Sequence, residues 1–299
     1  MKILLFGANG QVGWELQRSL SPLGAITALG HKDGDLEQPL RDLIGRACPD
    51  VIVNAAAYTA VDQAEAEPAR AMRINAVAVG EMAQAASSLG AVLVHYSTDY
   101  VFDGEKSGPY SEDDAPNPIN AYGRSKLAGE DAIRAVADCR HLILRTSWVY
   151  AMRGKNFART ILERAQAKDQ LQVVADTVGA PTSAELIADV TALALYRLRG
   201  AGPDRGAAGD LLGTFHLVPS GQTTWHEYAG FLVESARAHG IAIRVPPQGI
   251  LAVPSTTFAA PARRPKNSRL DNRQLQQRFD LELPDWRVHV RRFVAANAG

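Results

Sequence analysis

The sequence is poor in the features that mark disulfide-bonded, nucleic-acid-binding or membrane proteins. Its 299 residues include only two cysteines, Cys48 and Cys139, which are far apart in sequence and form no metal-ligand or redox pair. Basic and acidic residues number 32 each, so no net charge would attract nucleic acid or an anionic membrane. No apolar run approaches transmembrane length, and Met1-Lys2 leads straight into apolar residues, which leaves no room for a signal peptide. We therefore expect a cytoplasmic protein.

Metal-ligand patterns are also lacking. The seven histidines are scattered along the chain, and Trp225-His226-Glu227 lacks the second histidine of a zinc-binding helix. The sequence therefore predicts no metal site.

The chain does begin with a pattern typical of dinucleotide binding. Lys2–Phe6 predicts a buried strand, and a glycine-rich turn and a helical segment follow it. In such a pattern Gly7 permits the tight turn, Gly10 lets the backbone approach a pyrophosphate, and Gly13 allows close packing of helix on strand. The start of the helix offers free N–H groups to the phosphates. A dinucleotide site is therefore expected here.

The end of the second predicted strand, Ile26–Leu29, bears on the choice of cofactor. Dinucleotide folds often place an acidic residue there to hold the ribose hydroxyls of the adenosine. Here Gly30-His31-Lys32 follows instead, so two potential cations stand where a carboxylate is expected. This favours the 2′-phosphate of NADPH, and NADH remains possible because Asp35 follows shortly after.

A second pattern lies in Asn120–Glu130, which we interpret as the start of a helix. Tyr122 and Lys126 are four residues apart and therefore lie on one face of that helix. A nearby ammonium lowers the pKa of a phenol and suits it to protonating a carbonyl oxygen while a hydride reaches the carbon. Taken alone, the spacing also fits an exposed helix turn.

Small or polar residues follow three further predicted strands, at the edge where ligands bind in open α/β sheets. These segments are Asn54–Ala57, Ser97–Phe102 and Thr146–Tyr150. The first fits either a cofactor that lies against the backbone or a tightly packed strand end. Thr98 fits either a hydrogen-bond donor to the same carbonyl or a helix N-cap. Trp148 fits either a flat face for a sugar ring or a core residue.

The later chain alternates less regularly. The pattern predicts helices at Pro68–Leu89, Phe157–Lys168, Ala184–Arg199 and Thr224–His239. In the first of these helices, a buried Asn75 would need hydrogen-bond partners. Gly200–Gly209 is predicted to be a surface loop, and Thr214–Leu217 a strand. In the basic loop Pro261–Leu270, Arg263 and Arg264 fit either a grip on a diphosphate or a solvated surface.

These elements predict an α/β fold. We expect a Rossmann-type doubly wound parallel sheet with a smaller C-terminal substrate-binding α/β portion. The dinucleotide-binding domain, with the catalytic residues, is placed at residues 1–150. Residues 151–299 form the mainly substrate-binding portion, and the chain is free to cross back between the two.

Together the motifs resemble the extended short-chain dehydrogenase/reductases, and within them the reductases of 4-keto nucleotide sugars. The resemblance covers nearly the whole chain, and its landmarks are Gly7–Gly13, Asn54–Ala57, Ser97–Phe102, Tyr122 with Lys126, Arg145–Trp148 and Pro261–Pro265. It implies reduction of the 4-keto group of dTDP-4-dehydro-6-deoxy-L-mannose, the last step of dTDP-L-rhamnose synthesis for cell-surface polysaccharides.

The same resemblance implies roles for individual residues. Tyr122 would be the proton donor, Lys126 would hold the nicotinamide ribose and Thr98 would polarise the keto oxygen. Cofactor contacts are implied at Gly7, Gly10, Gln11, Val12, Gly13, Lys32, Asp35, Leu36, Ala56, Ala57, Tyr58, Thr59 and Tyr96. Contacts with the nucleotide-sugar substrate are implied at Thr98, Asp99, Trp148, Arg263 and Arg264.

Two alternatives follow from the same patterns. One is another nucleotide-sugar 4-ketoreductase or an epimerase or dehydratase. The 4,6-dehydratases of this superfamily carry Thr-Asp-Glu after the corresponding strand, whereas Tyr100 follows Thr98-Asp99 here, so the base that elimination needs is missing. The other alternative is a catalytically idle, NADP-binding regulatory subunit, against which the intact Thr98, Tyr122 and Lys126 argue.

The resemblance also raises the question of magnesium. Family members have been described as dimers bridged by Mg²⁺ through clustered glutamates, and Glu15 and Glu185 stand at matching positions. Trp286–Gly299 contains no further acidic residue, and Arg291 and Arg292 would repel a cation that prefers several oxygen ligands. We expect Mg²⁺ to be non-essential and any homodimer to be weak.

Overall fold

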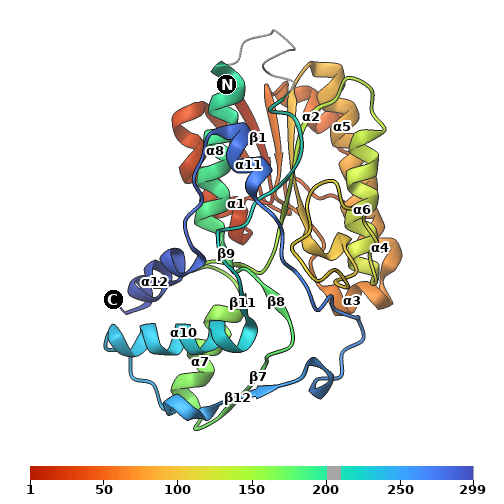
Figure 1. The fold of residues 1–299 in the computed structure, drawn as a ribbon. Helices are drawn as coiled ribbons and strands as arrows, with labels where there is room; N and C mark the ends of the chain where they lie inside the picture. Colours follow the sequence, from red (N-terminus) through yellow and green to blue (C-terminus); the bar gives the residue numbers. More distant parts are fainter. Residues whose placement is uncertain (201–209, 299) are drawn as a thin grey trace.

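A computed structural model describes residues 1–200 and 210–298 and shows two parts (Figure 1). The larger part is a parallel sheet with helices on both faces, and the smaller part lies beyond the carboxyl ends of its strands. Apart from Gly200, the predicted loop Gly200–Gly209 lies outside the described residues. Within the described ranges, no helix is long and apolar enough to cross a membrane.

The large sheet has six strands, and every neighbouring pair is parallel. In spatial order they are β10 (Gly213–His216), β5 (Arg140–Thr146), β4 (Val92–Thr98), β3 (Val51–Asn54), β1 (Lys2–Phe6) and β2 (Ala25–Leu29). Strand β1 lies between β2 and β3, so the chain changes direction across the sheet at this point. Ligands of open α/β sheets bind in the crevice that such a switch leaves at the carboxyl ends of the strands.

Alternate residues of each strand point to opposite faces of this sheet and bury against different helices. Ile3 and Leu5 face a core shared with α1 (Gln11–Leu20), α8 (Ala184–Gly200) and α11 (Arg273–Phe279). Leu4 and Phe6 face the opposite core, which is closed by α2 (Arg41–Ala47), α5 (Ala78–Leu89) and α6 (Ala121–Arg134). Both faces are therefore covered, as expected for the doubly wound fold.

The smaller part has its own core around Tyr150, Tyr228 and Trp286. Helices α7 (Phe157–Ala167), α10 (Trp225–Ala238) and α12 (Trp286–Asn297) surround it. Paired short strands complete it, namely β7 (Leu171–Val174) with β12 (Ile250–Val253), β8 (Val178–Gly179) with β11 (Thr223–Thr224), and β6 (Val149–Tyr150) with β9 (Thr182–Ser183). Because α8, β10 and α11 return to the large sheet, the chain crosses between the parts, and the division at residue 150 stays a prediction.

The helix predicted over Pro68–Leu89 is interrupted in the structure. Between α4 (Pro68–Met72) and α5 it widens into a π-helical turn, η2 (Arg73–Val77). Within this turn the Asn75 amide accepts from the Tyr58 backbone N–H at 2.9 Å and donates to the Tyr58 carbonyl at 3.0 Å. A Cβ on Gly129 of α6 would stand 2.1 Å from the Asn75 carbonyl oxygen. The widened turn thus fixes the Tyr58 loop and lets α6 approach closely.

Short elements complete the chain. They are α3 (Val61–Ala66) and the 3₁₀ turns η1 (Ser21–Leu23), η3 (Asp99–Val101), η4 (Pro247–Gly249) and η5 (Ser255–Thr257). Of these, η3 matters for function because it directly follows β4 at the carboxyl edge of the sheet.

Candidate active site

The glycine-rich turn after β1 has the shape that a pyrophosphate requires. Gly7 adopts a φ of +80°, and a Cβ there would lie 2.6 Å from the backbone of Ala55. A Cβ on Gly13 would lie 2.1 Å from the Gly7 carbonyl oxygen, so α1 packs directly on the turn. No side chain caps the N-terminus of α1, so its first N–H groups remain available to a phosphate. These residues fit a dinucleotide.

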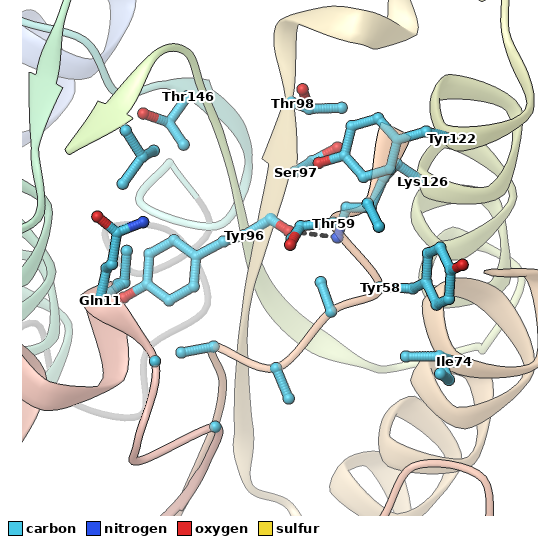
Figure 2. Close-up of a pocket in the computed structure, with 18 of the residues that line it drawn as sticks. Gln11, Tyr58, Thr59, Ile74, Tyr96, Ser97, Thr98, Tyr122, Lys126 and Thr146 are labelled. Carbon is cyan, nitrogen blue, oxygen red and sulfur yellow. Dashed lines mark hydrogen bonds between the residues drawn. The ribbon is translucent and has the colours of Figure 1, made fainter. Parts of the chain in front are cut away.

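A cavity of about 1190 Å³ runs along the carboxyl edge of the sheet from this turn. In Figure 2, Tyr122 and Lys126 reach it from α6, Tyr96 and Thr98 from β4, and Gln11 from the other side. Its lining includes most of the predicted site, namely Gly7, Gly10, Gln11, Val12, Asp35, Leu36, Ala56, Ala57, Tyr58, Thr59, Tyr96, Thr98, Asp99, Tyr122, Lys126 and Trp148. Segments far apart in sequence thus share one cavity.

Four predicted residues do not line this cavity. Gly13 packs beneath the turn, and Lys32 is exposed beside His31, which does line it. Arg263 is exposed, and the Arg264 guanidinium donates to the Asp62 carboxylate at 2.7 Å. The basic loop is thus anchored to the first turn of α3 (Val61–Ala66).

The helix α6 is fixed at its start, which sets the position of Tyr122. The Asn120 side chain caps the helix by accepting from the Gly123 N–H at 2.7 Å and donates to the Arg263 carbonyl at 2.8 Å. Gly123 meets η3, the turn after β4, so closely that a Cβ would lie 2.1 Å from the Tyr100 carbonyl oxygen. These contacts bring the first turn of α6 against the end of β4.

Burial controls the protonation of Tyr122. It raises the pKa of Tyr122 to about 12; a hydrogen bond with Thr98 lowers it and the charge of Asp99 raises it, both to a smaller extent. The Lys126 ammonium, expected from the sequence to favour a phenolate, is itself disfavoured because burial lowers the pKa of Lys126 to about 8. The phenol therefore keeps its proton at neutral pH. The phenol is therefore available as a proton donor and not as a base.

Thr98 and Asp99 line the cavity beside the phenol. The Thr98 hydroxyl accepts from the Tyr100 N–H at 3.2 Å, which caps η3, and donates to the Asp99 carboxylate at 3.0 Å. Thr98 is therefore a helix cap and a cavity residue together. Burial raises the pKa of Asp99 to about 6, and hydrogen bonds from Ser268 and Thr98 lower it. A hydroxyl and a carboxyl thus stand beside the phenol.

Two tryptophans close the cavity on the side of the smaller part. The rings of Trp148 and Trp225 stack with centroids 3.6 Å apart and planes 15° from parallel. Trp148 adopts a φ of +48°, and a Cβ on Gly179 would lie 2.6 Å from its ring. The stack therefore joins the loop after β5 to the start of α10. The sequence identifies Trp225 only as the first residue of a helix that Thr224 caps, and this does not predict a place in the cavity.

Other residues that line the cavity were assigned no individual contact from the sequence. These are Asn9, His31, Gly34, Glu37, Ala55, Ala60, Val61, Arg70, Ile74, Ser97, Tyr100, Thr146, Ser147, Val149, Arg153, Gly154 and Trp225. His31 was considered as a cation for the 2′-phosphate, and several others lie in the strand-end segments that the sequence predicts to meet a ligand. Arg153 and Trp225 come from segments beyond residue 150 that have no motif.

The glutamates considered for magnesium have cationic partners in the structure. Glu185 accepts from the Arg292 guanidinium at 2.9 Å, and Glu15 lies 3.6 Å from the Arg18 guanidinium. Burial raises the pKa of Glu15, and the nearby charge of Glu185 raises it further. Residues 1–200 and 210–298 contain no group of three metal-ligating side chains. This arrangement does not fit a bridging Mg²⁺.

Comparisons with known proteins agree with this geometry. The sequence model of the RmlD substrate binding domain family matches residues 1–298. A dTDP-4-dehydrorhamnose reductase of Shigella flexneri is 49% identical over 98% of this chain and 97% of its own. A solved dTDP-4-dehydrorhamnose reductase from Clostridium acetobutylicum superimposes with a TM-score of 0.89 at 34% identity, with 100% of both chains covered. A solved dTDP-4-dehydrorhamnose reductase from Bacillus anthracis in complex with NADP superimposes with a TM-score of 0.85 at 33% identity, with 98% of both chains covered.

Proposed function

The chain belongs to the RmlD substrate binding domain family, among the dTDP-4-dehydrorhamnose reductases, and on this premise we propose how its own residues carry the reaction. The reaction is the NAD(P)H-dependent reduction of the 4-keto group of dTDP-4-dehydro-6-deoxy-L-mannose to dTDP-L-rhamnose. The observation that supports the assignment most is one cavity that joins the glycine-rich turn to Tyr122, Lys126 and Thr98.

When bound, NADPH supplies the hydride that the reduction needs. The glycine-rich turn and the uncapped N-terminus of α1 would hold its pyrophosphate. Tyr58, Thr59 and Tyr96 would line the remainder of the cofactor site, and Lys126 would hold the nicotinamide ribose. All four residues line the cavity.

Tyr122 would donate the proton that the reduced oxygen must take up. Burial raises the pKa of Tyr122 to about 12, so the free site holds the protonated phenol that a reductase needs. The Thr98 hydroxyl would donate a hydrogen bond to the same keto oxygen and so stabilise the charge that develops there. Asp99 and Trp148 would contact the sugar. Trp225 would hold Trp148 in place through the stacked rings.

Several finer points stay predictions. Arg263 and Arg264 would grip the diphosphate of the substrate, although Arg264 already has Asp62 as a partner. We expect any homodimer to be weak, and we expect a cytoplasmic location, as for a biosynthetic enzyme that uses a nucleotide sugar. The reduced sugar would be consumed in cell-surface polysaccharide synthesis.

The assignment is tested with purified protein, the dTDP-4-keto sugar and NADPH. We expect loss of NADPH absorbance that depends on the sugar. A protein that binds NADPH but leaves it unoxidised in the presence of the sugar would instead be a cofactor-binding regulatory subunit. Reaction with other 4-keto nucleotide sugars at equal kcat/KM would show that the dTDP sugar is not the selected substrate.

We expect NADPH to be preferred over NADH, though not exclusively. Lys32 is exposed beside His31, and both stand where an acidic residue would favour NADH. Lys32→Ala should lower kcat/KM with NADPH by about fivefold at most, because an exposed ion pair contributes about 0.2–1 kcal/mol. It should leave kcat/KM with NADH unchanged, and Lys168→Ala is the matched surface control. A preference for NADH in the parent protein would refute the interpretation.

Removal of divalent metal should leave the activity largely intact. Glu185 already accepts a hydrogen bond from Arg292, so a cation would have to displace a guanidinium. The measurements are steady-state rates and sedimentation with EDTA and with added Mg²⁺. A dimer that dissociates on chelation, together with a loss of rate, would show that Glu15 and Glu185 suffice to bind the metal.

A further inference from the structure

Arg153 is a cation of the cavity to which the sequence assigned no contact. It lies between β6 and α7, in the smaller part, and it lines the same cavity as the glycine-rich turn. Its Nε–H group donates to the Asn9 carbonyl at 3.2 Å. Asn9 belongs to the glycine-rich turn, so Arg153 brings a permanent positive charge to the place where a pyrophosphate is expected.

The Arg153 guanidinium also lies over an exposed aromatic ring. Its central carbon is 4.3 Å from the centroid of the Trp14 ring, and Trp14 is 49% exposed. The face of a tryptophan attracts a guanidinium electrostatically. Trp14 stands one turn after Gly10 in α1 and does not itself line the cavity. Its ring therefore keeps the arginine beside the start of α1.

Neighbours of Arg153 fasten its segment to the same end of α1. The Asn156 NH₂ group donates to Oε1 of Gln11, the first residue of α1, at 2.9 Å, and to the Ala151 carbonyl at 2.7 Å. Gly154 adopts a φ of +75°, and a Cβ there would lie 3.4 Å from Cγ of Gln11. The backbone thus runs directly past the helix start. Arg153 is held there by its segment as well as by its side chain.

The charges around Arg153 favour an anion. The N-terminus of α1 carries a partial positive charge, and its first turn contains no acidic residue. Arg153 adds a full charge beside it, and among residues 1–200 and 210–298 no carboxylate lies within ion-pair distance of this guanidinium. By contrast Arg70, which also lines the cavity, is paired with Glu37 at 2.9 Å. A bound diphosphate would neutralise the uncompensated charge at the turn.

We propose that Arg153 binds the pyrophosphate of the dinucleotide and that Trp14 is the positioning residue that holds its guanidinium in place. The inference rests on one point of the proposed function, the placement of the pyrophosphate at the glycine-rich turn. Planar guanidinium donors match phosphate oxygens, and Arg153 needs only to exchange the Asn9 carbonyl for such an oxygen. NADPH and NADH share the pyrophosphate, so Arg153 strengthens the binding of both, whereas Lys32 bears on NADPH alone.

The first test measures ligand binding to the complete protein by calorimetry. The ligands are NADPH, NADH and ADP-ribose, which carries the pyrophosphate without the nicotinamide. Arg153→Gln should weaken all three by about tenfold, because hydrogen bonds between charged groups commonly contribute that factor or more. Lys155→Gln is the matched control, since it removes the same charge two residues away from an exposed side chain outside the cavity lining. It should leave the three affinities unchanged.

The second test measures the coupling between Trp14 and Arg153. Trp14→Leu should weaken the same three ligands by about threefold, because Arg153 keeps its charge but loses the ring that holds it. In the Arg153→Gln background, Trp14→Leu should have no further effect, since no guanidinium remains to be held. Tyr196→Leu, which removes an exposed ring from α8, is the control for loss of a surface aromatic side chain.

Each outcome decides a separate point. Unchanged affinities in Arg153→Gln would overturn the proposal, and a loss confined to NADPH would place the arginine at the 2′-phosphate instead. Weaker binding of dTDP, with the dinucleotides unaffected, would assign Arg153 to the sugar substrate. An equal effect of Trp14→Leu in both backgrounds would refute the role of Trp14. None of these measurements requires turnover. A parent protein that binds NADPH through Arg153 but leaves it unoxidised with the sugar would refute the proposed function alone.

Discussion

Tyr122→Phe is expected to lower turnover by about 10²–10⁴-fold, which is the usual contribution of a positioned general acid. The phenol is the protonated group beside Thr98 in the cavity, and burial raises its pKa to about 12, so it holds a proton over the whole neutral range. Removing only the hydroxyl leaves the ring packing intact, including the edge contact with Tyr100. The dissociation constant for NADPH should therefore change little.

The measurements are kcat for the reduction and NADPH binding by fluorescence, on both the parent and the variant. Tyr196→Phe, on an exposed part of α8, is the control for loss of a phenol far from the site. Near-normal turnover in Tyr122→Phe would remove Tyr122 from the role of acid. A variant that loses NADPH binding together with turnover would show that the phenol mainly holds the cofactor.

Glu130→Gln is expected to destabilise the protein by about 3–5 kcal/mol, because it leaves a buried guanidinium without its counter-ion. The Arg145 side chain donates to both Glu130 oxygens, at 2.9 and 2.7 Å, and the two side chains are 3% and 0% exposed. The pair joins β5 to α6 behind Lys126. The loss should appear as a lower free energy of unfolding in urea at constant m-value.

Arg134→Gln is the matched control, since it removes a second, more exposed partner of the same carboxylate. It should cost about 0–1 kcal/mol, as surface ion pairs do. Burial raises the pKa of Glu130, but its bonds to Arg145 outweigh this, and the net pKa lies below 4.5. The stabilisation from the pair should therefore be lost as the pH falls below 4.5. Equal effects of the two variants would contradict this account.

The sequence was informative where local chemistry determines structure. The strand, glycine turn and helix at Gly7–Gly13 were predictable because backbone sterics alone demand glycine there. The spacing of Tyr122 and Lys126 predicted a shared helix face, and the strand ends predicted the edge of the cavity. The parallel order of the sheet followed from the alternation of strands and helices.

The sequence could not reveal features that depend on contacts between distant segments. In the π-helical turn the Asn75 amide satisfies the backbone of Tyr58, which is 17 residues away, and the helical pattern of Pro68–Leu89 does not contain this contact. Trp225 reaches the cavity only because the smaller part folds against Trp148. His95 reads as one residue of a buried strand until Asn54 and Lys126 are seen on either side.

The sequence also could not predict the protonation state of Tyr122. An ammonium four residues away predicted a lowered pKa for Tyr122, but the structure shows that burial raises it. Desolvation depends on all the groups that pack around the ring, and the spacing of Tyr122 and Lys126 in the sequence gives no information about that packing. The direction of the shift decides the chemistry, because a protonated phenol serves reduction and a phenolate serves oxidation.

The central claim is that this cavity reduces the keto carbon of the dTDP sugar with a hydride from NADPH and a proton from Tyr122. The most direct test uses NADPH that carries deuterium at the transferred position, followed by mass spectrometry and NMR of the sugar product. The account predicts dTDP-L-rhamnose with one deuterium on C4, and almost none formed by Tyr122→Phe in the same time. Unlabelled product, or the keto sugar recovered unchanged from the parent protein, would contradict it.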